Sequence, residues 1–159
     1  MAIEIALLTP DDWAEFRAAR LASLAEAPLA FGGRYEDERD HTEATWRARL
    51  AVRAQFVARE AGATVGMAGV FREGPHEAGE LVSMWIAPSH RRRGVGRMLV
   101  ERAIAHARAI GCGEMRLLVA EDNPEAERLY ARCGFVRTGI SGPIRPGEPR
   151  QRHEMARVL

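Results

Sequence analysis

Hydrophobic and polar positions recur along the chain with two periods, one typical of strands and one of helices. Residues 3–8 alternate and predict a first strand. Thr9, Pro10 and Asp12 then supply a capping hydroxyl, a first-turn proline and an early acid, so a helix should follow and run to about residue 26. Its buried stripe, which contains one charged residue, consists of Trp13, Phe16, Arg20, Leu21 and Leu24.

Residues 28–40 interrupt this periodicity and predict an exposed loop. The loop carries an acidic patch of Glu36, Asp37, Glu38 and Asp40. Such a patch is either simply solvated or suited to a cationic substrate. A second helix capped by Thr42 should follow, with Trp46 and Leu50 one turn apart on its buried face.

Three strands are expected next, at residues 55–59, 64–71 and 80–86, as an antiparallel meander. A helix after Gly96 should bury Met98, Leu99, Ala103, Ile104, Ala107 and Ile110. Residues 115–120 are dense in aliphatics and predict a strand covered on both faces. Because a helix connects residues 80–86 to residues 115–120, these two strands should be parallel.

The last part of the chain predicts one more helix and two strands. Asn123 and Pro124 open the helix, and Gly134 ends it. Its apolar stripe consists of Ala126, Leu129, Tyr130 and Cys133. A short strand at residues 135–138, a long loop at 139–150 and a last strand at 153–159 should complete the fold.

Composition narrows the class of protein. The 159 residues, 47% hydrophobic and 28% charged, suit a single α/β domain spanning residues 1–159. No apolar run is long enough to span a bilayer and no signal peptide is evident, so we expect a cytoplasmic protein without a membrane partner. A net charge of +1 does not favour nucleic acid as a partner. Cys112 and Cys133 form neither a disulfide framework nor a metal site, so no metal is expected.

Local charge is concentrated in Arg91-Arg92-Arg93-Gly94-Val95-Gly96, directly before the helix that follows the third strand of the meander. Gly94 and Gly96 permit backbone conformations that a Cβ would hinder. Free amides at the start of the helix, with its positive dipole end, can then bind a phosphate. The alternatives are an arginine-rich turn that only joins strand to helix, or a site for nucleotides or nucleic acid.

The order of these pieces is similar to that of a known family. A strand, Arg-x-x-Gly-x-Gly opening a helix, a parallel strand, and Asn123-Pro-x-Ala126-x-x-Leu129-Tyr130-x-x-x-Gly134-Phe135 together resemble the GCN5-related N-acetyltransferase (GNAT) superfamily. The resemblance implies an α/β fold with a mixed, mostly antiparallel sheet of six or seven strands and about four flanking helices. A central parallel pair of strands would be splayed apart.

The resemblance also implies a site for acetyl-coenzyme A (acetyl-CoA), used as a cosubstrate. The pyrophosphate would bind to Arg91, Arg92, Arg93, Gly94, Val95, Gly96 and Arg97. The pantetheine arm would pair with the backbone of Met84, Trp85 and Ile86. Residues of the next helix that would contact the cofactor are Asn123, Ala126 and Tyr130, although Asn123 is equally suited to being only a helix cap.

Acetyl transfer to an amine needs a base, support for the developing oxyanion and a proton for the thiolate. By resemblance, Tyr130 is the acid that protonates the thiolate. Glu80, fourteen residues before Gly94, is the candidate base, acting directly or through a water, and it is equally consistent with an exposed charge at a strand edge. Weaker candidates are Glu121, His90 and His76. An amide near Met84 would support the oxyanion, and direct transfer is expected because neither cysteine is an evident nucleophile.

The acceptor is the least determined part. The resemblance places it between residues 31–40 and 139–150, where the acidic patch favours a cationic amine and Arg145, Arg150 and Arg152 favour a carboxylate or phosphate. The acceptor would be a small-molecule or peptide amine. A non-catalytic acyl-CoA-binding sensor is the alternative function. A homodimer is a further option, with the last strand as a free edge for pairing.

Overall fold

The computed structural model describes residues 2–159, and over this range one sheet of seven strands has the order β1-β2-β3-β4-β5-β7-β6. Only the β4–β5 pair is parallel among the strand pairs of these residues. The strands are β1 (Ile3–Leu7), β2 (Arg53–Glu60), β3 (Ala63–Phe71), β4 (Gly79–Ile86), β5 (Glu114–Ala120), β6 (Val136–Pro143) and β7 (Gln151–Val158). The predicted mixed, mostly antiparallel sheet with a central parallel pair is therefore confirmed.

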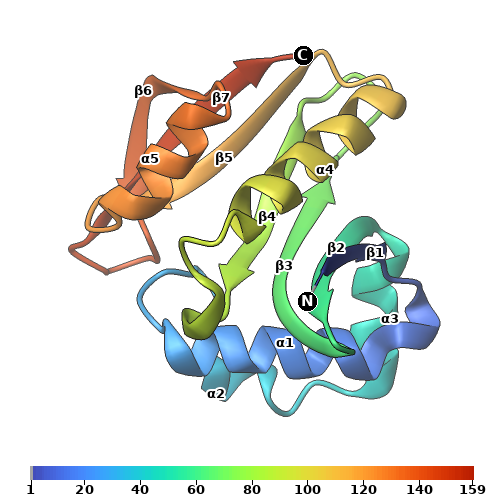
Figure 1. Cartoon of the computed structure of the whole chain (residues 1–159). Coiled ribbons are helices and arrows are strands. Elements are labelled where there is room, and N and C mark those ends of the chain that lie inside the picture. The colour runs from blue at the N-terminus through green and yellow to red at the C-terminus, as the bar shows by residue number, and fades with distance from the viewer. Residues whose placement is uncertain (1) are drawn as a thin grey trace.

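Helices cover both faces of this sheet (Figure 1). They are α1 (Trp13–Glu26), α2 (Tyr35–Glu38), α3 (Glu43–Ala51), α4 (Val95–Ala109) and α5 (Pro124–Arg132), with short 3-10 helices η1 (Pro10–Asp12) and η2 (Pro88–His90). One cluster of buried side chains joins α4 and α5 to the sheet, and a second joins α1 and α3 to its other face. None of the helices in residues 2–159 is both long enough and apolar enough to cross a membrane.

The helix starts follow local rules that the sequence already displayed. The Asp12 carboxylate accepts the backbone N–H of Thr9 at 2.8 Å. Thr42 Oγ1 accepts the N–H of Thr45, and Asn123 Oδ1 accepts that of Ala126, each at 3.2 Å. These side chains satisfy amides that a helix start leaves without intrahelical partners.

Strands β4 and β5 part soon after they meet. They pair only at Gly79 with Met115 and at Glu80 with Arg116, and Figure 1 shows the two strands diverging from there. In β4 the register against β3 shifts, and Ser83 has a positive φ of 52°. Such a bulge bends a strand and re-aims its side chains. The bulge places Ser83 where the sheet opens.

Two expectations about burial are wrong. Met98 and Ile110 were expected to be buried by α4 but are 38% and 40% exposed, and Val95 and Val100 occupy the core instead. Strand β5 is not covered on both faces, because its side chains alternate and Leu118 is 50% exposed. Its open face borders the space left by the diverging strands. A run of aliphatic residues in the sequence does not indicate that one face of the strand is open.

Two loop boundaries also differ from the sequence prediction. Residues 28–40 contain the short helix α2, and Glu38 on it is buried at 7% exposure. Residues 139–150 are not one long loop, since β6 continues to Pro143 through an irregularity near Gly139, which has a φ of 91°. Non-local pairing with β7 extends this strand beyond what its glycines and prolines suggest.

The last strand is not an edge strand. β7 lies between β5 and β6, so the free edge on this side belongs to β6. β6 exposes Val136 and Ile140, at 67% and 57%. Dimer formation stays a prediction, and the strand proposed for it is corrected to β6.

Candidate active site

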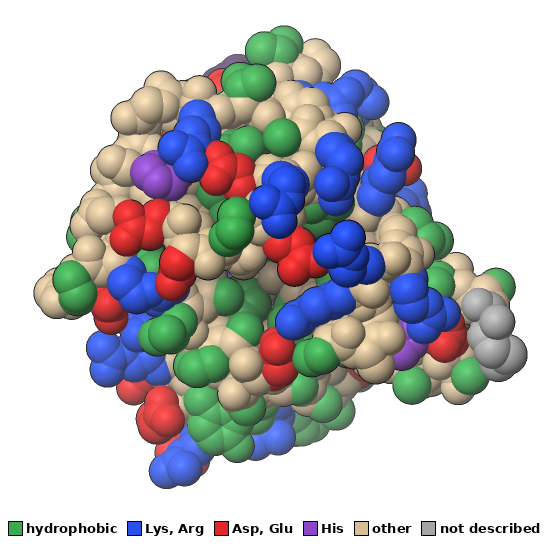
Figure 2. All heavy atoms as spheres, turned by 60° about the vertical axis from the view of Figure 1, so that its left-hand side comes forward, with side chains coloured by type: hydrophobic (Ala, Val, Ile, Leu, Met, Phe, Trp, Pro, Cys, Tyr) green, Lys and Arg blue, Asp and Glu red, His purple; other side chains and the backbone are tan. Residues whose placement is uncertain are grey.

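A cavity of about 890 Å³ opens where β4 and β5 diverge. Side chains and backbone from α1, the residue 27–32 segment, β4, the start of α4, β5, α5 and β7 line it. Figure 2 shows the molecule from this side, with basic side chains gathered along part of the face and hydrophobic ones visible in its hollow. The cavity reaches both faces of the sheet, so it has one side near α4 and α5 and another near α1 and α3.

The glycine loop forms the start of α4 on the first side. The helix begins at Val95, and its first bond runs from Met98 N to Gly94 O at 3.1 Å. The amides of Val95, Gly96 and Arg97 therefore have no carbonyl partner within the helix. Arg92 and Gly94 have φ values of 61° and 82°, which turn the chain into this helix start. Free amides at a helix start of this kind can bind phosphates.

The two glycines of the loop have different roles. At Gly94 a Cβ would meet no described atom within 4 Å apart from those of its chain neighbours, so a glycine is needed here for its positive φ and for the open space in front of the helix. At Gly96 a Cβ would lie 2.9 Å from Leu129 Cδ2. Gly96 thus lets α4 approach α5, whereas the sequence suggested close approach to a ligand.

The arginines of the loop are not equivalent. Arg91 donates to Glu26 at 2.8 Å and to the Ile86 carbonyl at 3.0 Å, and Arg93 donates to Glu60 at 2.9 Å. Arg93 and the buried Val95 are also absent from the cavity wall formed by the described residues. Arg91, Arg92 and Arg97 do line the cavity, and Arg97 pairs with Glu101.

Two further arginines on this side were not identified from the sequence. Arg128 and Arg132, one turn apart on α5, are exposed and line the cavity. The sequence signal for these two arginines was their spacing of four residues, which places both on one face of the helix that begins after Asn123. Glu26 was also missed, and no local pattern marks it, because its partners Trp85 and Arg91 are distant in sequence.

The three β4 residues expected to contact the cofactor all line the cavity. Met84 and Ile86 pack toward α4, and Trp85 packs on the other face. Beyond Glu80, the edge of β4 that faces β5 has no strand partner in the described sheet. Extended ligands can add to such an edge through backbone hydrogen bonds.

The motif residues of α5 lie on the same wall. Asn123 lines the cavity and caps the helix through its Oδ1, so both roles considered for it are compatible. Ala126 is half-buried beside it. Tyr130 is 6% exposed, packs edge-to-face with Phe135 and still borders the cavity. Burial raises the pKa of Tyr130, which keeps its phenol protonated.

Glu80 lines the cavity at its other end, exposed and opposite Arg116. At about 3.3 Å of rise per residue, its Cα lies roughly 13 Å from that of Met84 along the strand. At this separation Glu80 can reach an amine bound near Met84 only through a chain of several waters, not by direct contact. Of the weaker candidates, His90 lines the cavity and pairs with Glu60 at 3.2 Å, while Glu121 and His76 lie outside the described cavity wall.

Comparison with known proteins adds independent information. The Acetyltransferase (GNAT) family model matches residues 17–135. The chain is 40% identical over 68 residues to mycothiol acetyltransferase of Geodermatophilus obscurus, which covers 43% of this chain and 22% of that protein. It is 30% identical over 112 residues to streptothricin acetyltransferase of Streptomyces lavendulae, covering 70% of this chain and 56% of that protein.

A solved structure shares the fold over nearly the full length. The putative acetyltransferase yncA from Salmonella typhimurium, solved with acetyl-CoA, has a TM-score of 0.80 and 23% identity, and the match covers 100% of this chain and 95% of that one. The curated relatives above are longer, and the chain matches only about a fifth to somewhat over half of their lengths. The family match nevertheless spans most of the chain and includes both motifs, so the chain belongs to the acetyltransferase (GNAT) family.

Proposed function

We propose that the protein transfers an acetyl group from acetyl-CoA directly to the amine of a small-molecule or peptide acceptor. The observation that carries this proposal is the single cavity that joins the α4 anion site, the unpaired edge of β4 and Tyr130. Because one sheet supports all of these parts, we treat residues 1–159 as one acetyltransferase domain.

In this proposal the backbone does most of the cofactor binding. Amides at the start of α4, those of Gly96 and Arg97, bind the pyrophosphate, with charge added by the cavity-lining Arg92 and Arg97. The free edge of β4 at residues 84–86 pairs with the pantetheine arm. The Gly94 turn and its open space fit this role, since they leave room for a phosphate directly in front of the helix.

The chemistry is assigned to three groups. An amide near Met84 stabilises the negative charge that develops on the carbonyl oxygen. Glu80 removes a proton from the acceptor amine through water, and Tyr130 supplies one to the departing thiolate. Direct transfer is supported by the cysteines, because both are buried and burial raises the pKa of Cys133, which leaves its thiol unreactive.

The test is a screen for thiol release from acetyl-CoA against small and peptidic amines, together with calorimetric titration of acetyl-CoA. We expect binding of acetyl-CoA and turnover with at least one class of amine. Binding without turnover for any amine would instead indicate a non-catalytic acyl-CoA-binding module. Absence of binding would contradict the cofactor site itself.

A further inference from the structure

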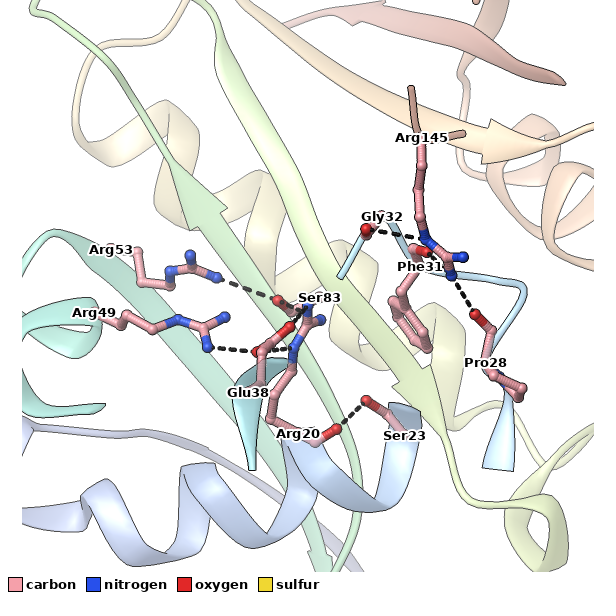
Figure 3. A network of polar contacts seen from close by, with 10 residues as sticks. All are labelled: Arg20, Ser23, Pro28, Phe31, Gly32, Glu38, Arg49, Arg53, Ser83 and Arg145. Atoms are coloured by element: carbon pink, nitrogen blue, oxygen red, sulfur yellow. Dashed lines mark hydrogen bonds and ion pairs between the residues drawn. The ribbon is translucent and has the colours of Figure 1, made fainter. Parts of the chain in front are cut away.

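Near α1 and α3, three arginines that line the cavity form a cluster with one glutamate, and the four side chains come from four different elements (Figure 3). Glu38 on α2 accepts from Arg20 through both oxygens, at 3.0 and 2.9 Å, and from Arg49 at 2.7 Å. Arg20 and Glu38 are each only 7% exposed. One carboxylate thus serves two guanidinium groups, with bidentate geometry for Arg20.

Arg53, on β2, is the third arginine of the cluster and has no carboxylate partner among residues 2–159. Its one hydrogen bond goes to the neutral hydroxyl of Ser83 at 3.2 Å, and its buried Nε has no partner in the described structure. The four side chains therefore carry two more positive charges than negative ones. Burial, followed by the charges of Arg49 and Arg20, lowers the pKa of Arg53 to about 10, so it remains cationic at neutral pH.

This excess charge faces the space where an acceptor would bind. Arg20, Arg49, Arg53 and Ser83 all line the cavity. Ser83 is the residue with positive φ in the β4 bulge, and its hydroxyl oxygen also accepts from Arg20 at 3.4 Å. Since that oxygen already accepts from two guanidinium groups, its own proton is available for a ligand. Two cations and a hydroxyl donor then meet at the bulge.

The cationic acceptor that the acidic patch suggested does not match this arrangement. Glu38 is neutralised by Arg20 and Arg49, and Glu36, Asp37 and Asp40 are exposed and lie outside the cavity wall of the described residues. Arg145 and Arg150 are also used structurally, because they bind backbone carbonyls of residues 28–32, and Arg150 pairs with Asp122.

Those same bonds restrict the size of the acceptor. Arg145 holds the carbonyls of Pro28, Phe31 and Gly32 at 2.7 to 3.2 Å, as Figure 3 shows, and thereby ties the segment after α1 to the segment between β6 and β7. The Phe31 ring lies over Arg20 with its centroid 5.3 Å from Cζ. This side of the cavity is bounded by two segments that are tied together, which fits a small molecule better than a peptide.

Arg53 and the candidate base Glu80 also share one face of the sheet. Arg53, Phe71 and Glu80 are paired in register across β2, β3 and β4. Two strand spacings separate Arg53 from Glu80, about 10 Å between Cα atoms. Side chains at positions 53 and 80 point to the α1 and α3 face, because neighbouring Leu81 packs on the opposite one. The face therefore offers a cation and an anion to one bound molecule.

Resting on the acetyltransferase function proposed above, we propose that the acceptor is a small amine that bears a carboxylate, such as a free amino acid, and that Arg53, with Ser83 and Arg20, binds this carboxylate. A guanidinium whose desolvation is not offset within the protein is stabilised by an anionic ligand. The uncompensated positive charge of Arg53 then contributes to specificity, because it repels amines that carry no carboxylate, such as polyamines.

The experiment measures acetylation of the standard free amino acids, of their carboxamides and decarboxylated amines, of phosphorylated amines and of polyamines. We expect turnover to favour free carboxylates. For the best amino acid, Arg53→Gln should raise KM about 10- to 100-fold, through loss of a charge-assisted bond, with the acetyl-CoA KM unchanged. Arg53→Lys should have a smaller effect. Arg39→Gln removes an exposed arginine, with a side chain 55% exposed, and should change neither KM.

The outcomes separate the acceptor from the general function. If acetyl-CoA binds and the carboxamides, polyamines, phosphorylated amines or peptides are preferred, the carboxylate assignment is wrong while the acetyltransferase proposal stands. The same holds if no free amino acid is acetylated, or if Arg53→Gln raises KM equally for an amino acid and its carboxamide. Failure to bind acetyl-CoA in the titration would remove both proposals.

Discussion

The two sides of the cavity are built in different ways. On the side of α4 and α5, the proposed cofactor contacts come from three short stretches of sequence, residues 84–86, 91–97 and 123–130, and the backbone supplies much of the proposed binding surface. On the side of α1 and α3, side chains of Arg20, Glu38, Arg49, Arg53 and Ser83 meet from five separate elements. A backbone site can keep one cosubstrate across many sequences, whereas a side-chain site can change its specificity by single substitutions.

The largest expected effect tests the chemistry on the side of α4 and α5. Tyr130→Phe keeps the packing against Phe135 and removes the proton donor. We expect kcat to fall about 10²- to 10⁴-fold, with acetyl-CoA affinity retained. Steady-state kinetics and calorimetry measure the two quantities. Tyr35→Phe, at a tyrosine that is 36% exposed on α2, is the control. Unchanged turnover in Tyr130→Phe would assign the proton to another group.

The next effect distinguishes the buried side-chain cluster from the backbone site. Glu38→Gln leaves Arg20 and Arg49 without their carboxylate. The Gly33 backbone packs closely against the position 38 side chain, since a Cβ at Gly33 would lie 2.1 Å from Glu38 Oε2, so the side chains have little room to rearrange. Breaking a buried pair costs about 3–5 kcal/mol of unfolding free energy. Urea unfolding should show this loss, and the exposed Glu36→Gln on the same helix should not.

The pH dependence of that loss has a definite sign. Burial raises the pKa of Glu38, but hydrogen bonds and charges from Arg20 and Arg49 outweigh it and hold the pKa below its usual value of 4.5. A carboxyl of this kind stabilises the fold above its unfolded pKa, and the stabilisation is lost as pH falls through the lower folded value. The stability difference between wild type and Glu38→Gln should therefore be constant near neutral pH and shrink below about pH 4.5. A gap that widens in acid would contradict this account.

A smaller effect is expected at the backbone site. Gly94→Ala introduces a Cβ at a φ of 82°, at a cost of about 1–2 kcal/mol, and fills space in front of the α4 amides. Gly139→Ala is a matched control, because Gly139 has a φ of 91° and is equally open among the described residues but lies on β6. Both variants should lose similar stability, and only Gly94→Ala should weaken acetyl-CoA binding, by about tenfold. Equal affinities would locate the pyrophosphate elsewhere.

The smallest effect concerns stability at Arg53. If this arginine serves a ligand rather than the fold, Arg53→Gln should unfold within about 0.5 kcal/mol of wild type, or be slightly more stable, because it relieves repulsion from Arg49 and Arg20. Chemical denaturation without ligand measures this. A clear loss of stability would show that Arg53 is a structural residue, and the carboxylate assignment would lose its main support.

Most strands and helices could be predicted from the sequence, because caps, turns and periodicity act over a few residues. Thr42 and Asn123 cap their helices as predicted, and Gly94 adopts the conformation that the loop requires. Errors occur where distant segments decide the outcome. β6 is lengthened by pairing with β7, and Leu118 is exposed because the sheet opens beside it. Exposed Met98 shows that a hydrophobic stripe identifies the buried face of a helix but not which residues at the margin of that face are buried.

By itself the sequence determined the order of most elements, the parallel pair and the two motifs shared with the family, since residues close together along the chain mark each of them. Only the tertiary structure decided which charges remain uncompensated. Glu38 looks like one acid of an exposed patch, yet it is buried between Arg20 and Arg49, while Arg53 is left to face the cavity without a carboxylate from the described residues. The physical reason is that a charge is compensated by whatever lies within a few ångströms in space, and residues 20, 38, 49, 53 and 83 come together only after folding.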